Sequence, residues 1–96
     1  MRQAVVLRKL EETQERLERA RHELVVLDEQ FAALDDAAEE LRIRNLVSET
    51  PLSSHDYGEM RRAADVLGKA RDAVRALLTE LLAAREELLS HVEAAQ

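Results

Sequence analysis

Three histidines and their neighbouring carboxylates are the side chains of this sequence best suited to metal binding or catalysis. Glu18 with His22, and Glu87 with His91, are each four residues apart, a spacing that places both side chains on one face of a helix. Carboxylate metal sites in helical bundles instead use inward-facing Glu residues with a Glu-x-x-His spacing, and Glu18 and His22 fall at outward positions. We therefore expect no metal site.

The sequence shows no other arrangement typical of an active site. It contains no cysteine, which excludes disulfides, thiolate metal ligands and a cysteine nucleophile. No Gly-rich loop follows a strand, and Gly58 and Gly68 stand singly, with Gly68 at a position expected to be exposed. We predict that the protein is not an enzyme and has no cofactor.

Composition and charge restrict the remaining classes of protein. Of the 96 residues, 46% are apolar but only 2% are aromatic, and there are two Gly and one Pro, which disfavours strand-rich folds. The formal charge of −6 argues against nucleic-acid binding. No apolar run approaches the length of a membrane span, and no apolar stretch follows the charged start of the chain, so we expect a cytoplasmic protein without membrane contact.

Apolar residues recur in heptads over both halves of the chain, the pattern of helices that pack along a narrow seam. The predicted fold is an all-α, antiparallel two-helix coiled-coil hairpin. The first half carries Val6, Leu10, Thr13, Leu17, Ala20, Leu24, Leu27, Phe31, Leu34, Ala38 and Leu41 at seam positions. The second half carries Met60, Leu67, Val74, Leu81, Leu88 and Ala95 in one series and Ala63, Ala70, Leu77, Ala84 and His91 in the other.

Turn signals separate the two halves. Pro51 disfavours helix at the residue before it. Ser53 has the features of an N-cap, with Asp56 three residues later completing a capping box, and Leu52 and Tyr57 are placed for a hydrophobic staple. We predict one domain over residues 1–96, with a helix over about 3–47, a turn over about 48–53 and a helix over about 54–94.

Centring the turn on Thr50-Pro51 predicts which residues face each other. In this register Phe31 faces Ala70, and acidic residues 23–40 lie beside Lys and Arg of the second helix. Exposed charge pairs of this kind contribute about 0 to 1 kcal/mol each, so they select the register rather than hold the fold.

A hairpin of two helices buries little apolar surface, so we expect two hairpins to associate as a four-helix bundle. A second apolar stripe lies outside the predicted seam, in the half of the hairpin distant from the turn. Scattered exposed leucines would give the same pattern without an interface. The expected self-association residues are Leu7, Leu78, Leu82, Leu89 and Val92.

The turn region has the composition of a protein-binding surface, because apolar residues and the only tyrosine are surrounded by arginines. Alternatively, the apolar residues could cap the end of the hairpin while the arginines pair with the acidic residues of 23–40. The predicted partner-binding residues are Arg42, Arg44, Leu46, Leu52, His55, Tyr57, Arg61 and Arg62. We expect a non-enzymatic adaptor, scaffold or regulator.

The predicted hairpin also resembles, in architecture, bacterial regulators that insert a coiled-coil hairpin into the secondary channel of RNA polymerase. Those proteins present carboxylates at the hairpin tip, and Glu49, Asp56 and Glu59 lie near the tip here. The chain lacks the second globular domain and the zinc cysteines that these families usually carry. The resemblance implies an alternative function, the regulation of transcription through an acidic tip.

Overall fold

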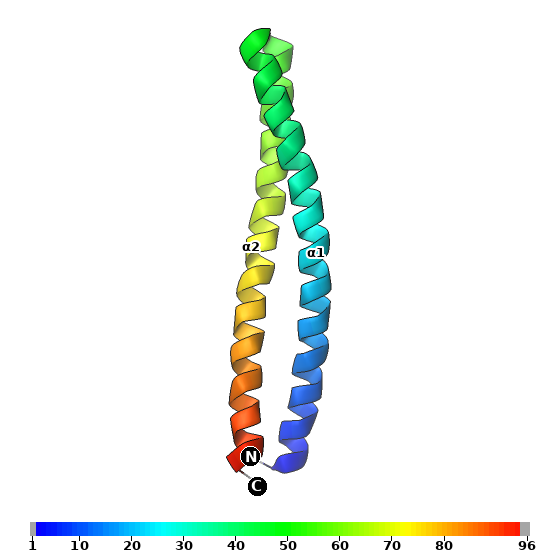
Figure 1. Ribbon diagram of the computed structural model, residues 1–96, viewed down its shortest axis with the longest axis vertical. Helices are drawn as coiled ribbons and strands as arrows, with labels where there is room; N and C mark the ends of the chain where they lie inside the picture. Colours follow the sequence, from blue (N-terminus) through cyan, green and yellow to red (C-terminus); the bar gives the residue numbers. More distant parts are fainter. Residues whose placement is uncertain (1, 95–96) are drawn as a thin grey trace. The chain divides into compact units, whose positions relative to one another are not determined.

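The chain folds into two long α-helices joined by a short turn. The computed structural model describes residues 2–94, in which α1 spans Gln3–Val47 and α2 spans Pro51–Ala94 (Figure 1). No strand occurs among these residues. The prediction of an all-α helical hairpin is confirmed. Over the same range, neither helix contains a segment both long and apolar enough to cross a membrane.

The start of α2 is fixed by a reciprocal pair of hydrogen bonds between Thr50 and Ser53. The Ser53 N–H donates to Thr50 Oγ1 at 3.0 Å, and the Thr50 N–H donates to Ser53 Oγ at 3.0 Å. Thr50 is therefore the N-cap, and Pro51 occupies the first helical position, where its missing N–H costs no helical hydrogen bond.

The prediction that Ser53 caps a helix beginning near residue 54 was wrong. Pro51 is already helical, because its fixed φ suits the first helical position and Thr50 supplies an earlier cap. The proposed staple between Leu52 and Tyr57 fails for the same reason: Leu52 is inside the helix, and 69% of its surface is exposed.

Asn45 ties the end of α1 to the start of α2. The hydroxyls of Ser53 and Ser54 donate to Asn45 Oδ1 at 2.7 and 3.1 Å. Asn45 follows Leu41 by four residues and is itself half-buried. A polar residue at this seam position therefore closes the turn through side-chain hydrogen bonds rather than through apolar packing.

Contacts divide the hairpin into two compact units. The turn unit is Val25–Asp72, and the terminal unit joins the chain up to Leu24 with the chain from Ala73 onward. Each unit has its own small core of mainly aliphatic residues. In the terminal unit these are Val6, Leu17, Ala20, Val74 and Leu81, and in the turn unit they are Ala38 and Ala64.

Both predicted series on α1 are buried or half-buried, but α2 follows the prediction in only one series. Met60, Leu67, Val74, Leu81 and Leu88 are buried or half-buried as expected, and Ala95 lies outside the described residues. In the other predicted series Ala70 and Leu77 are half-buried as expected, whereas Ala63, Ala84 and His91 are exposed. The series one residue later is buried or half-buried throughout. The residues that take this second seam position are Ala64, Arg71, Leu78, Arg85 and Val92.

The contacts of the turn unit explain why the buried face of α2 differs from the predicted one. Because α1 ends at Val47 and α2 begins at Pro51, the midpoint of the turn falls at Glu49 rather than at Thr50-Pro51. Phe31, expected opposite Ala70, packs instead on Gly68, where a Cβ would lie 3.2 Å from Phe31 Cε2. Gly68 is therefore buried, not exposed as predicted, because the absence of its side chain makes room for the ring.

Candidate functional site at the turn

Four large apolar residues around the turn are exposed to solvent. Ile43 is 50%, Leu46 72%, Val47 81% and Leu52 69% exposed. They belong to the last two turns of α1 and the first turn of α2, and we call them the tip cluster. Among residues 2–94 they include the most exposed of the large apolar side chains. A group of this kind on a protein surface is a feature of interaction sites.

A hollow of about 380 Å³ runs along the α1 side of the tip cluster, lined by Ile43, Arg44, Val47 and Ser48. Arg44 is exposed and makes no ion pair or side-chain hydrogen bond with any residue in the described range 2–94. The tip therefore offers apolar surface beside one guanidinium that has all of its donors available to a partner.

Arg42, in contrast, is held by α1 itself. Its Nε and Nη2 donate to the Glu39 carboxylate, with the shortest contact at 2.6 Å. Hydrogen bonding raises the pKa of Arg42 and lowers the pKa of Glu39. Both side chains are about half exposed, so the pair is a local helix contact rather than a buried one.

Arg61 bridges the two helices. Its Nη1 donates to Asp35 Oδ1 of α1 at 2.8 Å, and its Nε donates to Asp65 Oδ1 of α2 at 3.1 Å. The hydrogen bond to Asp35 is the main cause of the raised pKa of Arg61. Arg61 is 33% exposed in its side chain, and its Nε and Nη1 are engaged within the hairpin.

Arg62 and His55 both lie next to Glu59. Arg62 Nη2 donates to Glu59 Oε1 at 3.1 Å, and His55 Nε2 lies 3.9 Å from the same oxygen. Tyr57 is half-buried. Of the four arginines predicted to bind a partner, three are thus paired with carboxylates of the turn unit. Arg42 and Arg61 pair with acidic residues of 23–40, as the alternative interpretation anticipated, whereas the partner of Arg62 lies on α2.

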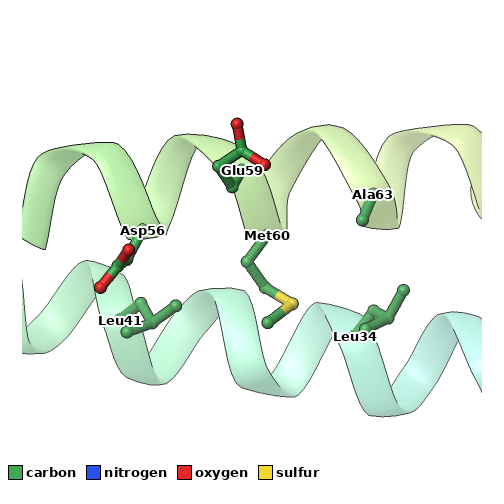
Figure 2. A pocket seen from close by; sticks show the side chains of 6 residues that line it. All are labelled: Leu34, Leu41, Asp56, Glu59, Met60 and Ala63. Atoms are coloured by element: carbon green, nitrogen blue, oxygen red, sulfur yellow. The ribbon is translucent and has the colours of Figure 1, made fainter.

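A second, larger groove lies between the helices of the turn unit (Figure 2). It has a volume of about 560 Å³. Met60 extends from α2 toward α1 between Leu34 and Leu41, and Ala63 and Asp56 flank it on α2. We call this site the Met60 groove; its lining residues are Leu34, Leu41, Asp56, Glu59, Met60 and Ala63.

Sequence reasoning missed two parts of this surface. Ile43 was not recognised, although an apolar residue outside the heptads is a usable signal, as it was for Leu46. The Met60 groove was missed because Leu34, Leu41 and Met60 were all assigned to a closed seam. In the structure these three residues are half-buried, so the seam is open on one side at this level.

The predicted self-association stripe is partly covered by the terminal unit itself. Leu7 is 48%, Leu82 37% and Leu89 38% exposed. Leu78 and Val92 are half-buried and belong to the second buried series of α2. Three of the five predicted residues therefore remain on the surface.

Among residues 2–94, no group of three or more His, Asp or Glu side chains is placed to hold a metal ion. His91, expected in the core, is exposed and lines a hollow of about 250 Å³ with Lys9, Ala84, Glu87 and Leu88. His22 is exposed as well.

Comparisons of the chain with protein-family models, with curated proteins and with solved structures found no match.

Proposed function

We propose that this chain is a non-enzymatic, cytoplasmic coiled-coil interaction protein that binds a protein partner through the tip cluster. The observation that carries the proposal is the exposure of Leu46, Val47 and Leu52, which is 72%, 81% and 69%. Burying such side chains against a partner removes apolar surface from water, at roughly 25 cal/mol per Å² before the costs of association. The turn thus offers a compact apolar anchor.

Arg44 adds a polar component to this anchor. It lies beside Ile43 and Val47, and no residue of the described range satisfies its donors. Arginine at the edge of an apolar patch is common in protein interfaces, because it forms directional hydrogen bonds while its stem packs on apolar neighbours. The contribution of Arg42, Arg61 and Arg62 is indirect, since their pairs with carboxylates stabilise the turn unit.

Self-association is the second part of the proposal. Leu7, Leu82 and Leu89 keep between 37% and 48% of their surface exposed in the terminal unit. Leu82 and Leu89 are seven residues apart and so lie on one face of α2. Pairing of two such faces across a two-fold axis would form a four-helix bundle.

A cross-linking experiment tests the tip proposal. A photoreactive residue in place of Leu46 should cross-link to one protein in extract of the native cells, while the same residue in place of the exposed Glu29 should not. Leu46→Asp with Leu52→Asp should then abolish binding of that purified protein. The matched control, Val25→Asp with Val26→Asp, introduces the same charge at exposed apolar residues of the same unit and should bind normally. Equal binding by both double variants would reject the tip cluster.

An acidic-tip regulator of RNA polymerase is the alternative proposal. Its support is that Glu49 and Asp56 are exposed and make no ion pair or hydrogen bond with the described residues, whereas Glu59 is engaged by Arg62. Glu49→Gln with Asp56→Asn should abolish an effect of the protein on transcription in vitro. An unchanged effect, or the absence of any effect from the unsubstituted protein, would dismiss this alternative.

A further inference from the structure

The Met60 groove is an apolar cleft that the hairpin leaves open. Leu34, Leu41 and Met60 are half-buried and Ala63 is exposed, so none of the four apolar lining residues is fully covered. Filling the cleft with apolar side chains would complete packing that the two helices leave unfinished at this level. Met60 can pack against side chains of different shape in this cleft, because its unbranched thioether side chain is flexible.

The edge of the groove is acidic. Asp56 and Glu59 both line the cleft. The Asp56 side chain makes no hydrogen bond or ion pair with the residues of the described range, whereas Glu59 is paired with Arg62. The turn unit around it, Val25–Asp72, holds eleven Asp and Glu against six Lys and Arg, a formal charge of −5 out of the −6 of the whole chain. Electrostatic complementarity therefore favours a positively charged occupant.

The length of the groove fits a helix. Leu34 and Leu41, at its two ends on α1, are seven residues apart, which is about 10.5 Å along a helix axis. An occupant helix that runs along the groove presents side chains at i and i+7 with the same separation, and those at i+3 or i+4 reach the middle, where Met60 lies. An extended segment would place its alternate side chains about 6.6 Å apart and would match less well.

We propose that the Met60 groove binds the apolar face of a positively charged amphipathic helix from a partner protein. Apolar side chains at i, i+4 and i+7 occupy the cleft beside Met60. Lys or Arg side chains on the flank pair with Asp56 and, in exchange for its present partner Arg62, with Glu59. This inference rests on the proposed function as an interaction protein, and it specifies the chemistry of a partner segment.

A fluorescent peptide of about 18 residues, built from Leu, Ala and Lys with Leu at i, i+4 and i+7, is the probe. We expect a saturable rise in its fluorescence anisotropy with the full chain, and none for the same peptide with Glu in place of Lys. Met60→Glu should abolish binding, with circular dichroism confirming that the variant remains helical. Asp56→Asn with Glu59→Gln should weaken binding about fivefold to tenfold at low salt.

The matched control for charge is Glu29→Gln with Asp36→Asn. Both residues are exposed, lie in the turn unit outside the groove and have no ion pair within the described range. This variant has the same net charge as the groove variant and should bind the probe within twofold of the unsubstituted chain. If both double variants weaken binding of the probe equally, the probe is attracted by the overall negative charge of the chain, and the inference is overturned.

Two further outcomes would also contradict the proposal. If sedimentation shows that the unsubstituted chain self-associates and that Met60→Glu makes it monomeric, a second copy is the occupant of the groove. If the partner cross-linked at Leu46 binds Met60→Glu normally but loses binding on Leu46→Asp with Leu52→Asp, the tip proposal stands and the groove proposal fails.

Discussion

The Phe31 ring of α1 packs on Gly68 of α2 at a position where a side chain does not fit. A Cβ on Gly68 would lie 3.2 Å from Phe31 Cε2, and Arg71 Cζ lies 4.2 Å from the centre of the same ring. The only phenylalanine of the chain thus contacts both a glycine and a guanidinium of α2. This contact fixes which face of α2 meets α1 in the turn unit.

Enlarging Gly68 should therefore destabilise the hairpin. Gly68→Leu is expected to lower the free energy of unfolding by about 1 to 3 kcal/mol, because the new side chain displaces Phe31. With Phe31→Ala already present, the same substitution should cost much less. Urea unfolding of the four chains in this double-mutant cycle measures the coupling.

Gly58 provides the control for this cycle. A Cβ there would meet only the flexible end of Arg62, at 3.4 Å. Gly58→Ala should therefore raise stability by up to about 1 kcal/mol through helix propensity alone. If Gly68→Leu proves as stable as the unsubstituted chain, the packing of Phe31 on Gly68 does not set the register.

The capping pair at the start of α2 makes a second prediction. Thr50→Ala should lower the free energy of unfolding by about 1 kcal/mol, since the Ser53 N–H loses the Thr50 Oγ1 acceptor. Thr50→Ser keeps an oxygen at the same place and should be close to neutral. Thermal unfolding followed by circular dichroism compares the two variants. A harmless Thr50→Ala would argue that the helix begins later than Pro51.

The pair between Glu39 and Arg42 predicts a dependence on pH with a defined sign. Because the folded chain lowers the pKa of Glu39, its contribution is complete above the unfolded pKa, about 4.3, and is lost as the pH falls through the folded pKa. Glu39→Gln should therefore be less stable than the unsubstituted chain at pH 7, with the difference shrinking below about pH 4. Melting temperatures from pH 2 to 8 provide the measurement, and a constant difference would contradict the assignment.

Arg42 and Arg61 should add no pH dependence in this range. Hydrogen bonds to Glu39 and Asp35 raise their pKa values, so the stability they contribute is fully present below the unfolded pKa of arginine, which lies well above this range. Any loss of stability between pH 5 and 9 must then come from other groups.

Negative charge placed on the exposed face of α2 tests whether the terminal unit self-associates. Leu82→Glu with Leu89→Glu places two carboxylates on the exposed face of α2 and should convert a dimer into a monomer in sedimentation equilibrium at micromolar concentration. Val25→Glu with Val66→Glu, at exposed apolar residues of the turn unit, should leave the dimer intact. A dimer that survives Leu82→Glu with Leu89→Glu would place the interface elsewhere.

Part of the functional surface could be read from residue types alone. Leu46 and Leu52 lie outside the heptads, and this was enough to mark them as free for a partner; both are exposed. The arginines could not be interpreted in this way. Arg61 precedes Asp65 by four residues, a spacing that the sequence shows, but its contact with Asp35 joins two helices. Sequence spacing does not indicate which carboxylate of α1 lies beside an arginine of α2.

The sequence alone determined that the protein is two helices with a turn between them. Heptads of Leu, Ala and Val, interrupted once at Pro51, allow little else, and on α1 they also identified the buried face. On α2 apolar residues stand side by side at 63–64, 77–78, 81–82 and 88–89, so the heptads do not specify which of two neighbouring faces is buried.

Only the tertiary structure chose between those two faces. The helix start at Pro51 moved the turn, the Phe31 ring required the space over Gly68, and the second buried series of α2 shifted by one residue. This shift exposed Ala63 and His91 and left the Met60 groove open. The physical reason is that periodicity specifies a hydrophobic stripe, whereas the shapes of the side chains that meet across the seam specify the register.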